Sequence, residues 1–169
     1  MNIYTTDKIR NVVLLGHGGS GKTSLAEAFG YLSGITSRMG KVDDGNTLSD
    51  YSKEEQKRHF SISTSVIPIE WEGYKINIID TPGYFDFVGE VEEAVSAAGA
   101  AIIVVNGKSG IEVGTQKAWE LCEKYKLPRF IYVSNMDVDN ASFRQVVEDM
   151  TNLYGNCLLY TSDAADDKA

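Results

Sequence analysis

Cysteine, proline and long apolar runs are all scarce in this chain of 169 residues. Its two cysteines are too few for a disulfide framework, so we expect a protein of the reducing cytoplasm. No apolar run approaches the roughly 20 residues of a membrane-spanning helix. The first residues also lack the basic and apolar segments of a signal peptide, and we therefore expect neither export nor a membrane partner.

Positive charge is also in short supply, since 16 lysines and arginines face 24 acidic residues and leave a net charge of −8. A domain with this balance is not built to coat nucleic acid, and we expect no sequence-specific DNA binding. Any RNA-rich partner must be met through a local patch or through parts of the protein outside this chain. The 43% hydrophobic fraction is that of an ordinary globular protein, and the length predicts one domain.

The most informative segment is glycine-rich and follows the spacing G-x-x-x-x-G-K-T. A short apolar run precedes it, and apolar residues at helical spacing follow it, which is the strand, loop and helix context of a phosphate-binding loop. Glycines let backbone N–H groups turn toward an anion in conformations that a Cβ would forbid. The alternative is a glycine-rich turn in another α/β protein. The residues predicted to bind nucleotide here are Gly16, His17, Gly18, Gly19, Ser20, Gly21, Lys22, Thr23 and Ser24.

Two side chains of this loop have specific chemical roles. Lys22 supplies positive charge to the terminal phosphates, and the Thr23 hydroxyl can hold Mg²⁺. The helix that begins near Lys22 points the positive end of its dipole at the phosphates.

Strands and helices alternate along the rest of the chain. This order predicts an α/β fold of the P-loop type, in which helices cover both faces of a mostly parallel sheet that includes one antiparallel hairpin strand. The long polar stretch 34–58 shows no clear periodicity and is expected to be a functional or mobile loop. The expected strands are 12–15, 61–71 with a possible slip near Pro68, 74–79, 101–105 and 130–133, and the expected helices are 22–32, 88–98, 113–125 and 143–153.

Two further motifs follow strand ends, so both should lie beside the glycine loop. Asp80, Thr81, Pro82 and Gly83 form the first, in which a carboxylate at a strand tip can hold Mg²⁺ through water and a glycine N–H can bond the γ-phosphate. The alternative is an ordinary turn. In the second motif, Asp137 can accept two hydrogen bonds from guanine that adenine cannot donate, which predicts a preference for guanine.

Together these motifs resemble the GTP-binding domain of translational GTPases, in particular elongation factor G and its second-type branch. The resemblance covers roughly residues 7–156, and its first switch region resembles residues 34–61. It implies GTP, GDP and Mg²⁺ as ligands, GTP hydrolysis, a ribosomal partner and a monomer. It also implies that Thr23, Ser61 and Asp80 serve the metal, and that Lys22, Gly83 and Tyr84 serve catalysis.

Ser61 departs from the switch threonine of the family but keeps its hydroxyl, so its role is expected to survive. Three other positions also depart from the family pattern. Ser134 replaces an asparagine that braces the phosphate loop and contacts the base, and Asn135 replaces a lysine that covers the base. Both changes predict weaker nucleotide binding, by about 1–3 kcal/mol. Tyr84 replaces the histidine that positions the attacking water, so hydrolysis is expected to be slow or to need the ribosome. The alternative is that Tyr84 only packs over Phe85 and Phe87.

Other residues that could carry chemistry have simpler interpretations. His17 is expected to be structural, His59 to be a solvated switch residue, and Cys122 to be a small core residue. The run 53–58 is expected to be a polar helical face, and a ribosomal contact there is possible by family analogy.

The domain is expected to span residues 1–156 and to be incomplete, because its final guanine-contact loop lies beyond that point. Residues 157–169 resemble a translated sequencing adapter, and the alternative is a natural acidic tail. The resemblance implies translocation, with ribosome-protection and release factors as alternatives that share the motifs. A nucleotide-controlled binding module with very slow hydrolysis is a further alternative. A P-loop kinase is less consistent with residues 80–83.

Overall fold

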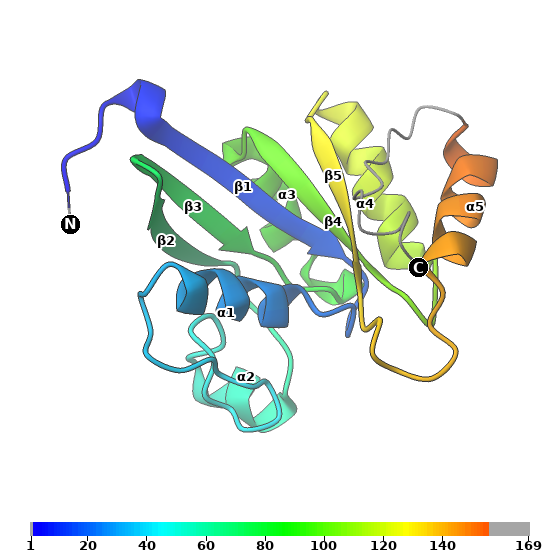
Figure 1. Ribbon diagram of the computed structural model, residues 1–169, viewed down its shortest axis with the longest axis horizontal. Helices are drawn as coiled ribbons and strands as arrows, with labels where there is room; N and C mark the ends of the chain where they lie inside the picture. The colour runs from blue at the N-terminus through cyan, green and yellow to red at the C-terminus, as the bar shows by residue number, and fades with distance from the viewer. Residues whose placement is uncertain (1, 156–169) are drawn as a thin grey trace, which may run out of the picture.

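In the computed structural model, which describes residues 2–155, five strands form one sheet in the order β2-β3-β1-β4-β5 (Figure 1). Strands β1, β3, β4 and β5 are parallel, and β2 pairs antiparallel with β3. This arrangement confirms the predicted fold class. The strand bounds are β1 (Ile9–Gly16), β2 (Ser65–Trp71), β3 (Tyr74–Asp80), β4 (Ala100–Asn106) and β5 (Arg129–Ser134).

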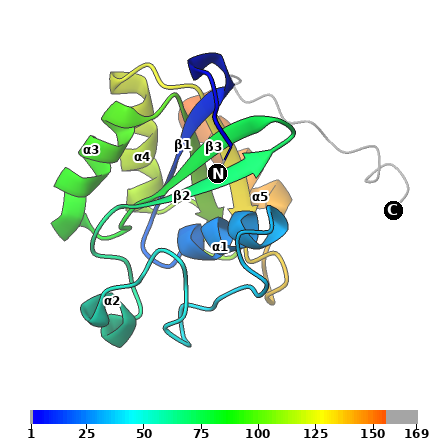
Figure 2. The ribbon, with the colours of Figure 1, turned by 90° about the vertical axis from the view of Figure 1, so that its left-hand side faces the viewer.

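Helices cover both faces of this sheet and make a three-layer domain (Figures 1 and 2). The α-helices are α1 (Lys22–Leu32), α2 (Lys53–Arg58), α3 (Val88–Ala97), α4 (Val113–Lys124) and α5 (Phe143–Tyr154), and two 3₁₀ turns are η1 (Thr6–Lys8) and η2 (Phe85–Phe87). Each long predicted helix is present within one or two residues of its expected bounds. No helix within residues 2–155 combines the length and apolar character needed to cross a membrane.

Alternation along β1 explains why the sheet has two cores. Val13 and Leu15 point to one face, where they pack with buried residues of α3, α4 and α5. Leu14 points to the other face and packs with Leu25 of α1. Because both faces of the central strands are buried, these strands are almost continuously apolar, which is why the sequence pattern located them correctly.

The first strand of the hairpin is shorter than predicted. Strand β2 begins at Ser65 rather than at residue 61, and its register with β3 runs from Ser65 to Trp71 without the predicted slip near Pro68. The preceding backbone N–H groups are engaged elsewhere, since those of Ile62 and Ser63 donate to the Glu55 carboxylate at 3.0 and 3.1 Å. These groups therefore cannot extend the ladder.

Two buried carboxylates organise the stretch 34–61, which the sequence analysis treated mainly as a loop. Glu27 of α1 accepts hydrogen bonds from the backbone N–H groups of Gly40 and Leu48. Glu55 closes a capping box with Ser52 at the start of α2, which confirms the helical interpretation of 53–58. Both carboxylates are 1–2% exposed, so their hydrogen bonds to backbone N–H groups compensate for the cost of burying them.

Cys122 of α4 is fully buried in the core, as predicted. Burial raises the pKa of its thiol to about 11, so the group is inert at neutral pH. The proposed foreign tail at 157–169 lies outside the described residues.

Candidate nucleotide site

A cavity of about 320 Å³ opens at the carboxyl end of the parallel strands. Its walls come from four segments that are far apart in the sequence: the glycine loop, the stretch 42–50, residues 59–61 and the turn after β3. The lining residues are Gly18, Gly19, Gly21, Lys22, Thr23, Ser24, Val42, Asp43, Asp50, His59, Phe60, Ser61, Thr81, Gly83 and Tyr84. The predicted convergence of the glycine loop and the turn after β3 is therefore confirmed.

The loop glycines serve two different purposes. Gly16, Gly19 and Gly21 have φ angles of 143°, 77° and 93°, which a side chain disfavours. Gly18 has no positive φ, so the prediction that all four glycines are needed for their backbone conformation is wrong at this position. Gly21 also precedes α1 without any side-chain cap, which leaves the N–H groups of the first turn available to an anion.

Lys22 lies buried behind the loop, and its Nζ donates to the carbonyls of Gly16 at 3.1 Å and His17 at 2.8 Å. Burial lowers the pKa of Lys22 to about 8, against the opposing attraction of Asp80 and Glu112. A buried ammonium held by two neutral carbonyls is poorly compensated. A polyanion in the cavity would therefore gain a strong electrostatic partner.

The three residues predicted to serve the metal form one buried hydrogen-bonded cluster. The Thr23 hydroxyl donates to Asp80 Oδ2 at 2.8 Å and lies 3.1 Å from the Ser61 hydroxyl. The other carboxylate oxygen of Asp80 is buried and has no hydrogen-bond partner among residues 2–155. Burial raises the pKa of Asp80 to about 6, with Lys22 and Thr23 opposing that shift. Hard oxygen ligands and a buried carboxylate oxygen without a hydrogen-bond partner fit Mg²⁺.

Asp50 is a residue of this site that the sequence analysis missed. Its carboxylate lines the same cavity, the residue is 3% exposed, and neither side-chain oxygen has a hydrogen-bond partner within the described part of the chain. Burial also raises the pKa of Asp50. No motif surrounds it in the sequence, since Asp50 lies in the aperiodic polar stretch. Only the fold brings it to the cavity.

Tyr84 lines the cavity and makes contacts that the alternative interpretation did not include. Its ring lies 4.7 Å, centroid to centroid, from the ring of Phe60, and it covers Gly18. The preceding residue, Gly83, touches the loop so closely that a Cβ there would lie 2.7 Å from the Gly18 nitrogen. The turn after β3 is thus in direct contact with the phosphate loop. Pro82 lines a second, apolar pocket next to this turn.

Ser134 still braces the glycine loop despite its short side chain. Its hydroxyl donates to the carbonyl of Ser20 at 2.6 Å and lies 3.2 Å from that of Val105. The short side chain reaches the loop because the loop approaches β5 closely at Gly21, where a Cβ would lie 3.5 Å from that of Ser134. The weaker nucleotide binding that the shorter donor predicts stays a prediction. The predicted loss of base contacts stays a prediction.

Replacing Ser134 with alanine is expected to weaken GTP binding about tenfold. The change leaves the Ser20 carbonyl without its partner and loosens a loop that must be ordered to bind phosphate, a cost of about 1–1.5 kcal/mol. A fluorescence titration would measure it. Ser96→Ala removes an exposed hydroxyl that bonds a carbonyl within α3 and serves as the control. Equal affinity of the Ser134 variant and the wild type would contradict the brace.

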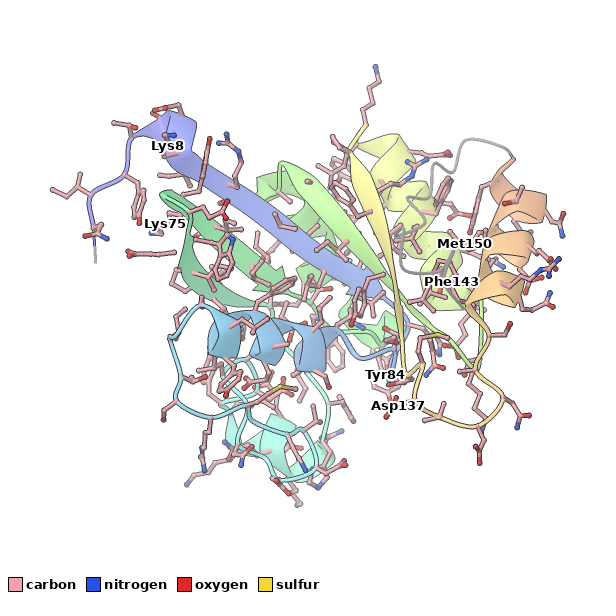
Figure 3. All side chains as sticks on the ribbon, viewed as in Figure 1. Lys8, Lys75, Tyr84, Asp137, Phe143 and Met150 are labelled. Carbon is pink, nitrogen blue, oxygen red and sulfur yellow. The ribbon has the colours of Figure 1, made fainter. Side chains whose placement is uncertain are left out.

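The remaining predicted base-binding residues do not line the cavity. Asn135 and Asp137 follow β5 and are exposed. Asp137 lies at the same end of the sheet as Tyr84 and opposite Lys8 and Lys75 (Figure 3). Asn135 has a φ of 53°, a conformation that asparagine tolerates better than most residues. The segment that follows β5 is anchored at its start by the Gly107 N–H, which donates to the Ser134 carbonyl at 2.8 Å.

The two histidines have the surroundings that the sequence analysis expected. His17 turns away from the cavity toward α4, where its Nδ1 accepts from the Gly114 N–H at 3.3 Å and its Nε2 lies 3.7 Å from Glu112. His59 ends α2 with a φ of 58° and lies exposed at the edge of the cavity. Its Nδ1 lies 3.2 Å from the Val42 carbonyl.

Comparison with known proteins agrees with this geometry. The family model for the elongation factor Tu GTP binding domain matches residues 7–166. The chain belongs to this family. Within the family, it is 40% identical over 146 residues to elongation factor G 2 of Borreliella afzelii strain PKo, an alignment that covers 86% of the chain and 22% of that protein. It is 38% identical over 141 residues to mitochondrial ribosome-releasing factor 2 of Rattus norvegicus, with 83% of the chain and 18% of that protein covered.

Solved structures share the fold of this GTP-binding domain. The crystal structure of ttk003000868 from Thermus thermophilus superposes with a TM-score of 0.84 at 38% identity, over 92% of the chain and 24% of that protein. Elongation factor SelB of Methanococcus maripaludis shares the fold, with a TM-score of 0.62 at 19% identity over 85% of the chain and 25% of that protein. The chain spans about a fifth of the length of the curated relatives that it matches.

Proposed function

We propose that the protein containing this chain is a translation factor of the elongation factor G type that hydrolyses GTP on the ribosome and drives translocation. The observation that carries the proposal is the cluster of Thr23, Ser61 and Asp80 beside the glycine loop. It joins the phosphate loop, the first switch region and the strand tip at one point. Contacts among these segments are what a sensor of the γ-phosphate requires.

In this proposal the chain positions the reacting groups and stabilises their charge, and none of its residues forms a covalent bond with the nucleotide. Backbone N–H groups of 16–21 and the Lys22 ammonium hold the phosphates, and Tyr84 orients a water in line with the γ-phosphorus. Thr23 and Ser61 would hold Mg²⁺ directly, with Asp80 and Asp50 nearby. When bound, the ion neutralises charge on the β- and γ-phosphates. Asp137 would select guanine. The predicted set of nucleotide-binding residues stays a proposal.

Loss of the γ-phosphate would release two contacts with the nucleotide, one made by residue 61 and the other by residue 83. The stretch 34–61 is suited to this change because much of it is held by side-chain carboxylates rather than by a sheet. Affinity for the ribosome would then depend on which nucleotide is bound. Because the relatives include ribosome-releasing factor 2, a release-type role remains the alternative task for the same chemistry.

GTP turnover of the full-length protein with and without ribosomes tests this function. We expect slow turnover alone and an acceleration of at least about 100-fold by ribosomes, because Tyr84 cannot accept a proton as a histidine can and must be placed by the partner. Rapid turnover without ribosomes would contradict placement by the partner. Undetectable single-turnover hydrolysis under both conditions would instead favour a nucleotide-controlled binding module.

A further inference from the structure

Position 18 requires glycine because there is little space for a side chain, and not because of its backbone angles. Its φ lies outside the positive region that the other loop glycines occupy. A Cβ at Gly18 would lie 3.1, 3.2 and 3.3 Å from three ring carbons of Tyr84. These separations are tighter than ordinary van der Waals contact, so either the ring or the loop would have to shift. The neighbouring Gly19 is the reverse case, with a φ of 77° and open space where its Cβ would point.

The ring of Tyr84 has a second support in the first switch region. Phe60 packs against it with a tilt of 58° between the ring planes, an arrangement that is favourable for aromatic pairs. Phe60 directly precedes Ser61, whose hydroxyl belongs to the cluster with Thr23 and Asp80. Tyr84 is 46% exposed, so these ring contacts are a large share of what holds its side chain.

The backbone at Tyr84 is tied to the loop as well. A Cβ on Gly83 would lie 2.5 Å from Lys22 Nζ and 2.7 Å from both the nitrogen and Cα of Gly18. Gly83 therefore allows the turn after β3 to touch the phosphate loop, and this contact places the next residue directly above Gly18. Backbone contact below and ring contact at the side together define where the Tyr84 hydroxyl can go.

We infer that Gly18 and Phe60 are positioning residues for Tyr84, and that a bare glycine at 18 is matched to a tyrosine at 84. The inference rests on the proposed function, in which Tyr84 orients the attacking water. Gly18 provides the space for the ring, and Phe60 links its orientation to the state of the first switch region. A side chain at 18 would displace the hydroxyl from the γ-phosphate while leaving the phosphate contacts of the loop in place.

A double-mutant cycle tests the match on the full-length protein with ribosomes. Gly18→Ala is expected to lower kcat about tenfold or more with less than a threefold change in KM, because it disturbs orientation rather than binding. In a Tyr84→Ala background, the same change is expected to alter kcat less than twofold, since the ring that it displaces is gone. Equal effects of Gly18→Ala in both backgrounds would overturn the inference.

Gly19→Ala is the matched control within the same loop. Because its cost is a backbone conformation and not a collision with Tyr84, it should weaken GTP binding equally with tyrosine or alanine at 84. If Gly18→Ala behaves like Gly19→Ala, by raising the dissociation constant for GTP without a selective loss of kcat, then Gly18 serves the phosphates only and the inference fails.

A spectroscopic readout separates this inference from the proposed function. With 3-fluorotyrosine placed at position 84, both Gly18→Ala and Phe60→Leu are expected to change its ¹⁹F chemical shift, whereas Gly19→Ala should change it little. This result would support the contacts even if the wild type hydrolysed no GTP, in which case only the proposed function would fall. Unchanged shifts in both variants would overturn the positioning role whatever the turnover.

Discussion

Replacing Lys22 with methionine is expected to weaken GTP binding by at least about 100-fold while leaving the domain folded. Methionine has a similar length and suits a position that is only 6% exposed, so the change removes mainly the charge. In the free protein, the ammonium is held by two carbonyls and pays a desolvation cost, which is why its pKa is lowered to about 8. Its compensation comes from phosphate charge.

The measurement is a titration with a fluorescent GTP analogue, together with thermal unfolding of the free protein. We expect the two proteins to unfold within a few degrees of each other, because the variant loses a buried charge that the free state stabilises poorly. Lys75→Met is the matched control, since Lys75 lies at the opposite end of the sheet (Figure 3). If the Lys22 variant binds GTP as tightly as the wild type, the cavity is not the phosphate site.

Asp80 is expected to make Mg²⁺ binding strongly dependent on pH below about 6. Burial raises the pKa of its carboxyl to about 6, and only the ionised form can serve the metal. In the GDP complex, the apparent Mg²⁺ affinity should fall by up to about tenfold per pH unit as the pH drops below that pKa. Asp80→Asn should lower the affinity at pH 7.5 by more than about tenfold and remove this dependence.

A rise in pH that ionises Asp80 favours metal binding, but in the metal-free protein the same ionisation lowers the free energy of unfolding. Because the pKa of Asp80 is raised from 3.8 to about 6 in the folded state, its contribution to the unfolding free energy is full below about pH 4 and is lost as the pH rises to 6. The loss is about 3 kcal/mol and should be absent in Asp80→Asn. Urea unfolding between pH 4 and 7 measures it. A stability that rises through this range because of Asp80 would contradict the burial argument.

The sheet and the helices that pack on it could be predicted because their physics is local and periodic. Val13 to Leu15 are apolar without interruption because both faces of β1 are covered, and the glycine loop follows directly. Residues that end parallel strands meet at one edge, so Asp80 could be placed beside Thr23 from topology alone. The hydrogen bond of 2.8 Å between them bears out that step.

The first switch region could not be predicted in the same way, because long-range polar contacts determine its path. Glu27 holds the backbone N–H of Gly40, 13 residues away, and nothing in the sequence marks that pairing. Asp50 reaches the cavity for the same reason. The Ser52-x-x-Glu55 spacing is the one local clue, since it is a capping box that locates the start of α2.

Gly18 shows a second limit of sequence analysis. A glycine in a phosphate loop is easily attributed to backbone freedom, yet three of the four glycines have positive φ angles and this one does not. Its reason lies in a side chain 66 positions away, which only packing shows. Ser134 shows the same limit, because how far a short hydroxyl reaches depends on how closely the loop approaches β5.

The central claim is that separate segments of this chain meet around Mg²⁺-bound GTP. Calorimetric titration of the full-length protein with GTP and with ATP, each in Mg²⁺ buffer, tests it most directly. The account predicts that GTP binds at least about 100-fold more tightly, because Asp137 would pair with donors that adenine lacks, and that chelating the metal weakens binding. Equal affinity for the two nucleotides, or GTP binding unaffected by removal of the metal, would contradict it.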